Sequence, residues 1–151
     1  MLDQLLSLFR GESSDQPTAK HDRHQLAAAA LLVTAAAMDD DFEAAERERI
    51  RILLETRFAL SSAEADELLA DAETWAEESV DLHGFTSAIK AGFEPHERVD
   101  VMEMVWEVVY TDGRLHDHEA SLMRRLAGLL GVTDRESGSA RLRVRRKLGL
   151  D

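Results

Sequence analysis

Cysteine is absent from this sequence of 151 residues. Its absence excludes disulfide bonds, thiol catalysis and zinc–thiolate sites. Proline occurs only twice and glycine eight times, so few residues interrupt regular structure. No apolar run approaches the length of about 18 residues that a membrane-spanning helix requires. The N-terminus also lacks the basic region and cleavage site of a signal peptide, so we expect a soluble, cytoplasmic protein.

Basic residues are outnumbered, with 18 Lys and Arg against 30 Asp and Glu and a net charge of −12. An acidic chain disfavours nucleic acid and favours cations or basic protein surfaces, so we expect protein partners and no nucleic acid. A basic cluster near the C-terminus departs from this trend: Arg141, Arg143, Arg145, Arg146 and Lys147. These cations can offset a helix dipole and bind the acidic body of the same or another chain.

Ala, Leu, Glu and Arg dominate the rest of the sequence, and these strong helix formers predict an all-α fold. Apolar spacing and capping signals predict helices at about 22–38, 43–58, 62–79, 82–93, 95–111, 117–130 and from the Thr133 cap to 148. Ser61 with Glu64 and Thr133 with Glu136 form capping-box patterns. Pro95 suits a first helical position, and Gly131 suits a helix stop.

For two of these helices the sequence also predicts which residues or which helix will be buried. In the first predicted helix, apolar residues recur at helical spacing along one face: Leu26, Ala30, Val33 and Ala37. The helix predicted at 95–111 is the most hydrophobic segment, and we expect it to be the central helix of the bundle.

The first 21 residues differ from the rest. Residues 1–10 have the apolar spacing of a short amphipathic helix, and 11–20 read as a polar linker. So short a helix is marginal alone and must dock on its own domain, a partner or a membrane surface. We therefore predict two parts, 1–21 and a helical domain at 22–151. The chain would be peripheral to a membrane if residues 1–10 bind one.

An acidic turn between two helices occurs twice. A shift of 73 positions superposes Asp39 on Asp112 and Glu46 on Glu119. The surrounding helices repeat as well, so the chain predicts a single-domain bundle of about seven helices. The bundle would consist of two pseudo-symmetric three-helix units bridged by the helix at 82–93, with the short N-terminal helix in addition.

The second turn, Asp112-Gly113 followed by Leu115 and Glu119, resembles the signature of TerB-like domains. The likeness covers about 22–149. It implies an all-α bundle associated with tellurite resistance and stress-linked gene clusters, without established enzymatic activity. It also implies metal binding at acidic positions, here Asp39, Glu46, Asp112 and Glu119, with Asp41, Glu43 and Asp117 as secondary candidates. The first copy departs from the pattern at Asp40, where the second has Gly113.

Three interpretations of these acidic turns stay open. Their carboxylates and free turn carbonyls offer hard oxygen ligands for Ca²⁺ or Mg²⁺, although neither turn has EF-hand spacing. Glu46 and Glu119 also fall near the third position of their helices, where a carboxylate caps the helix and complements its dipole. Docking of a partner on the acidic face is a third interpretation.

Catalytic patterns are not found. The sequence has no Ser/His/Asp order, phosphate-binding glycine loop or nucleophile elbow. His116 and His118 lie two positions apart at a helix start and point in different directions, which disfavours zinc. We therefore predict a non-catalytic binding or scaffold module in a stress response. The alternatives are a divalent-cation sensor that changes helix packing and a membrane-associated adaptor acting through 1–10.

Overall fold

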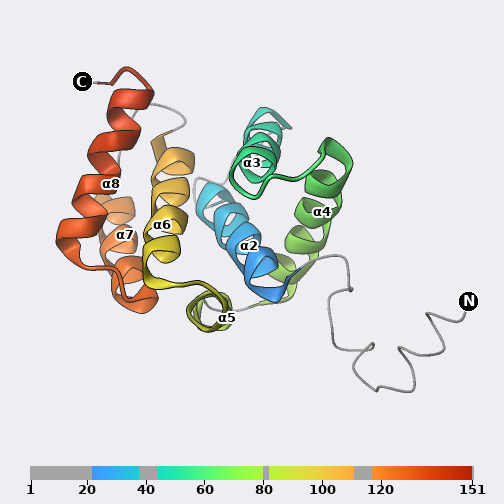
Figure 1. Cartoon of the computed structure of the whole chain (residues 1–151), viewed down its shortest axis with the longest axis horizontal. Helices are drawn as coiled ribbons and strands as arrows, with labels where there is room; N and C mark the ends of the chain where they lie inside the picture. Colours follow the sequence, from blue (N-terminus) through green and yellow to red (C-terminus); the bar gives the residue numbers. More distant parts are fainter. Residues whose placement is uncertain (1–21, 38–43, 80–81, 111–116, 151) are drawn as a thin grey trace, which may run out of the picture.

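The computed structural model describes residues 22–37, 44–79, 82–110 and 117–150, with side chains omitted for 117–120. In this part of the chain it has seven helices and no strand (Figure 1). The helices are α2 (Arg23–Ala37), α3 (Ala44–Arg57), α4 (Ser62–Glu78), α5 (His83–Gly92), α6 (Pro95–Val109), α7 (Asp117–Leu130) and α8 (Asp134–Lys147). The all-α prediction is confirmed, and each predicted helix end lies within two residues of the observed one. The helix predicted at 1–10 falls outside the described residues.

The helices form two three-helix units, as the internal repeat predicts. In the first unit α2 packs chiefly against α4 and less against α3, and in the second α6 packs chiefly against α8 and less against α7. The first, second and third helices of one unit are therefore arranged like the first, second and third helices of the other. α5 lies between the units and contacts α2, α6 and α7, while α2 and α6 pack directly on each other (Figure 1).

The connection after the second helix is the same in both units. α3 is followed by Ala59 at φ 54°, and α7 is followed by Gly131 at φ 73°. The next amide, from Leu60 or Val132, donates to the carbonyl five residues earlier, at 3.0 and 2.8 Å. This is the Schellman ending of a helix, which requires a left-handed residue. Gly131 has that conformation freely, whereas the Cβ of Ala59 is crowded in it.

The third helix of each unit begins with the predicted capping box. The Ser61 hydroxyl accepts from the Glu64 amide at 3.1 Å, and the Thr133 hydroxyl accepts from the Glu136 amide at 3.0 Å. Each glutamate in turn accepts from the backbone amide of the capping residue. The bonds from Thr133 hold the pKa of Glu136 below its usual value. Local sequence alone therefore fixes these two helix starts.

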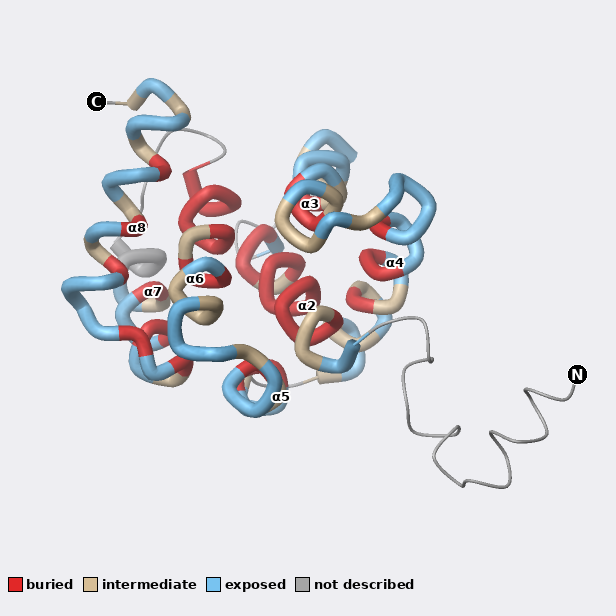
Figure 2. Tube along the Cα trace, viewed as in Figure 1, coloured by how far each residue is buried: buried red, intermediate tan, exposed pale blue. Residues whose placement is uncertain are grey.

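The core is centred on α2 and α6 together (Figure 2). Every residue from 26 to 33 is buried, so α2 is enclosed on all sides. Leu26, Ala30 and Val33 of the predicted apolar face are buried, but burial extends beyond that face to all of 26–33. Ala37, the last residue of the predicted face, is exposed. The physical reason is that α4, α5 and α6 all pack on α2, and its alanines let them approach closely. α6 is central as predicted, but it shares that place with α2.

Candidate functional site

The predicted acidic turns fall mainly outside the described residues. Those outside are Asp39, Asp41, Glu43 and Asp112, together with the side chains of Asp117 and Glu119. Glu46 is described: it lies in the first turn of α3, is half-buried and has an interaction partner. Within the described ranges no three His, Asp or Glu side chains gather as a metal site would require. Metal binding at the turns therefore stays a prediction.

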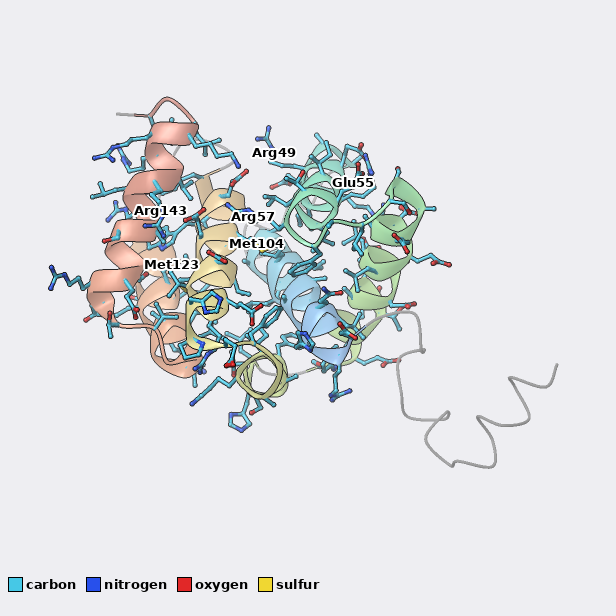
Figure 3. All side chains as sticks on the ribbon, in the orientation of Figure 1. Arg49, Glu55, Arg57, Met104, Met123 and Arg143 are labelled. Atoms are coloured by element: carbon cyan, nitrogen blue, oxygen red, sulfur yellow. The ribbon has the colours of Figure 1, made fainter. Side chains whose placement is uncertain are left out.

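A network of ion pairs joins α3, α6 and α8. Arg57 at the end of α3 donates to Glu103 of α6 at 2.6 Å, and Arg143 of α8 donates to the other carboxylate oxygen at 2.6 Å. One turn along α6, Glu107 accepts from Lys147 at 3.0 Å and lies 3.9 Å from Arg57. Figure 3 shows Arg57 and Arg143 reaching toward α6 from opposite sides. Arg57 thus connects the first unit to the second.

The carboxylate of Glu103 stays charged because of these partners. Burial raises its pKa, since its side chain is only 14% exposed. The hydrogen bonds and charges of Arg57 and Arg143 together outweigh burial and hold the pKa below its usual value. The network therefore stabilises the joint between the units most when Glu103 is ionised.

The basic cluster of α8 is used within the chain. The Arg141 side chain donates to the Tyr110 hydroxyl at 2.6 Å, and its guanidinium lies 5.3 Å from the centre of the Trp106 ring. Arg145 stacks over Tyr110 at 5.5 Å. With Arg143 and Lys147 bound to α6, four of the five clustered cations contact their own domain. Binding within the same chain is one of the two roles that the sequence analysis gave for these cations.

Charge is separated between α4 and α8. α4 has seven acidic residues and no basic one: Glu64, Asp66, Glu67, Asp71, Glu73, Glu77 and Glu78. α8 has six basic residues against two acidic ones. The two helices lie at opposite ends of the long axis of the described part (Figure 1). Arg47 of α3 neutralises part of the acidic helix through Glu73 at 3.0 Å and Asp66 at 3.3 Å.

A family model described as "Tellurite resistance protein TerB" matches residues 25–142. The match extends from α2 into α8 and covers most of the chain. The chain belongs to the TerB family. The resemblance noted at the second acidic turn is thereby confirmed, and the TerB match includes both turns. Searches of curated proteins and of solved structures found no match.

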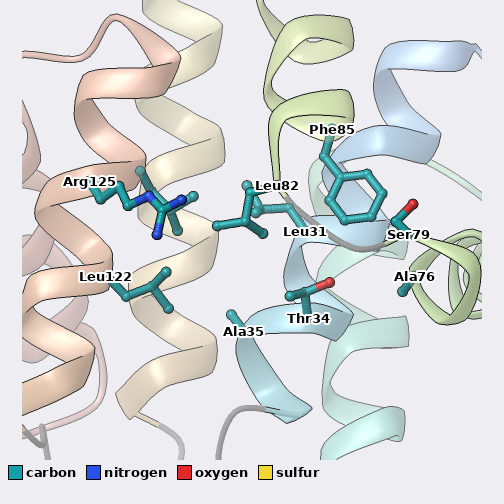
Figure 4. A pocket seen from close by; sticks show the side chains of 10 residues that line it. Leu31, Thr34, Ala35, Ala76, Ser79, Leu82, Phe85, Leu122 and Arg125 are labelled. Atoms are coloured by element: carbon teal, nitrogen blue, oxygen red, sulfur yellow. The ribbon is translucent and has the colours of Figure 1, made fainter.

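A cavity of about 230 Å³ lies at the junction of the two three-helix units (Figure 4). It is bounded by α2, the end of α4, α5 and α7. Its lining is mainly apolar, and Arg125 contributes the one charged group among the described residues around it. None of the described helices has the length and apolar character to cross a membrane.

Sequence reasoning missed the ion network and the cavity. A signal for the network was present, because Glu103 and Glu107 lie one helical turn apart within the otherwise apolar stretch 101–110. Carboxylates on one face of a buried helix require charged partners. Which cations supply them depends on packing between distant helices. The cavity had no signal in the sequence, because four separate helices form it.

Proposed function

We propose that this TerB-family chain is a non-catalytic binding and scaffold module of the tellurite-resistance type, acting in a stress response. Family membership supports the type of module. The separation of charge between α4 and α8 supports its mode of action, because a helix surface rich in carboxylates attracts and orients a basic partner. The partner would be a protein with a basic face, which binds along α4.

The contacts between the two three-helix units support the scaffold role. Arg57, Glu103 and Arg143 tie the two units together, and α5 fills the space between them. A surface held in place by such contacts keeps its charges in a fixed arrangement, which lowers the cost of ordering on binding. Without thiols, the chain itself is not expected to reduce tellurite.

Capture from a lysate of the native cell tests this function. The full chain is immobilised, and bound proteins are eluted by raising the salt concentration, which screens charge. Glu77→Lys reverses one exposed charge on α4, and Asp100→Lys is the matched control on exposed α6 surface. We expect Glu77→Lys to release the bound partner and Asp100→Lys to retain it. Equal retention by both variants would exclude α4 as the binding surface.

A second proposal is binding of Ca²⁺ or Mg²⁺ at the acidic turns. It is supported by the duplication of the turn and by the matching helix connections in the two units. The test is calorimetric titration with Ca²⁺, Mg²⁺, Mn²⁺ and Zn²⁺. The double variant Asp112→Asn with Glu119→Gln should abolish the binding heat. The proposal fails if the heat is absent or is unchanged in that variant.

A cation sensor would also change helix packing. Trp106 and Tyr110 are buried and stacked at 5.8 Å, so their near-ultraviolet circular dichroism reports the packing of α6. We expect a change on adding Ca²⁺ if the domain is a sensor. Cation binding without such a change would leave a static site and would refute the sensor proposal.

Membrane recruitment through residues 1–10 is the remaining proposal, based on their apolar spacing. Deleting residues 1–20 should abolish sedimentation of the chain with liposomes. Unchanged sedimentation after the deletion would exclude this role.

A further inference from the structure

The cavity between the units has one charged side and several apolar ones (Figure 4). Leu31 and Ala35 of α2 form one wall, and Phe85 of α5 closes another. Leu122 and Arg125 face them from α7, one turn apart. With about 230 Å³ of free space, the cavity holds a small molecule rather than a peptide.

Three polar side chains line the cavity, and two of them have no partner among the described residues. The Thr34 hydroxyl donates to the Ala30 carbonyl at 2.9 Å, which leaves its oxygen free to accept. The Ser79 hydroxyl and the Arg125 guanidinium have neither a hydrogen bond nor an ion pair in the described part of the chain. None of the described lining residues is acidic. Among the described residues, the cavity therefore offers donors to an anion without a competing carboxylate.

We propose that this cavity binds a monocarboxylic acid with a short aliphatic chain. The apolar tail lies between Leu31, Phe85 and Leu122, where it displaces water from aliphatic and aromatic surface. The carboxylate lies at Arg125, whose planar guanidinium donates two parallel hydrogen bonds to such a group. Ser79 supplies a further donor.

The exposure of Arg125 determines the orientation of the ligand in the cavity. Arg125 is exposed, whereas Leu31 and Phe85 are at most 2% exposed. The tail therefore enters first and the charged head stays near solvent. This arrangement avoids burying a carboxylate away from water, which would cost far more than the cavity can return.

The probes are octanoate, octanol and acetate, added to the full chain below the concentration at which octanoate forms micelles. Octanoate has both the tail and the charge, octanol lacks the charge and acetate lacks the tail. Binding is followed by the two indole signals in a nitrogen–proton correlation spectrum. Trp75 packs edge-on against Phe85 at 5.0 Å, whereas Trp106 stacks on Tyr110. Octanoate should shift the Trp75 signal saturably and leave Trp106 unchanged.

Two variants separate the head from the tail. Arg125→Gln should weaken octanoate binding about tenfold, since a charge-assisted hydrogen bond is lost. Arg124→Gln is the matched control, because Arg124 is exposed beside it and does not line the cavity. Ala76→Leu fills the cavity and should abolish binding in a protein that still unfolds cooperatively.

Several results would overturn the proposal. They are the absence of saturable binding, equal affinity for octanol and octanoate, and equal loss in Arg125→Gln and Arg124→Gln. Should Ala76→Leu fail to fold, the comparison of the two arginine variants still decides the matter.

Discussion

Arg57 and Glu103 lie 46 residues apart in the chain and form an ion pair at 2.6 Å between the two three-helix units. Their side chains are 23% and 14% exposed, so the pair is largely withdrawn from water. Breaking a partly buried pair of this kind costs more than breaking a surface pair, because removing one partner leaves a charge without compensation. The pair therefore connects the two three-helix units within the fold and is not a surface contact.

Replacing Arg57 by Met should lower the free energy of unfolding by about 1–3 kcal/mol, since Glu103 keeps only Arg143 as a close partner. Chemical denaturation measures the change. Arg49→Met on the same helix is the control, because Arg49 is exposed and forms no ion pair in the described structure. Its effect should stay within about 0.5 kcal/mol. Equal effects of the two variants would show that the pair does not stabilise the joint.

Stability should fall in acid partly through Glu103. Its folded pKa is held below the unfolded value of about 4.3, so the unfolded chain takes up the proton first as the pH falls. The contribution is complete above the unfolded pKa and is lost as the pH drops through the folded pKa. In Glu103→Gln the decline of stability between about pH 5 and pH 3 should be shallower. Glu78→Gln, on exposed α4 surface, should keep the original slope.

Ala59→Gly should stabilise the fold by about 0.5–1 kcal/mol. The left-handed conformation of Ala59 costs about 1–2 kcal/mol for a residue with a Cβ, and part of that gain is offset by the greater freedom of glycine in the unfolded chain. The equivalent change in the other unit, Gly131→Ala, should destabilise by about 1 kcal/mol or more. Thermal unfolding measures both. Effects of the same sign would contradict the equivalence of the two connections.

Gly92→Ala should destabilise the packing of α5 on α2. A Cβ at Gly92 would lie 2.3 Å from the His24 ring and 2.4 Å from its Cβ, and His24 is held edge-on against Phe93 at 4.5 Å. Overpacking of this kind costs about 1–3 kcal/mol. Gly84→Ala on the same helix meets no atom within 4 Å and should be neutral or stabilising. Chemical denaturation of both variants checks the difference, and a neutral Gly92→Ala would refute the close approach.

The elements of this fold that sequence predicts are those with local causes. Ser61 and Thr133 select their helix starts through residues three positions away, and Pro95 begins α6 through its own fixed φ. The ion pair between Arg57 and Glu103, by contrast, depends on residues that are distant in the sequence. Glu103 signals the need for a cation, but only the packing of α3 and α8 against α6 decides which cation it receives.

The same distinction applies to the candidate sites. The sequence of alanine-rich α2 shows one apolar face at helical spacing, yet burial extends all round the helix because four other helices pack on it. The cavity beside Arg125 follows from that convergence and from no motif. The acidic turns show the opposite case: Asp112 and Glu119 are conspicuous in the sequence, and their role as ligands stays a prediction.

The most direct test of the central claim is the affinity of the captured partner for the purified chain, measured at low and at physiological salt. We predict that Glu77→Lys weakens binding at low salt and that its difference from the wild type shrinks as salt rises, while Asp100→Lys binds as the wild type does. An affinity unaffected by Glu77→Lys at both salt concentrations would contradict a binding module that acts through α4.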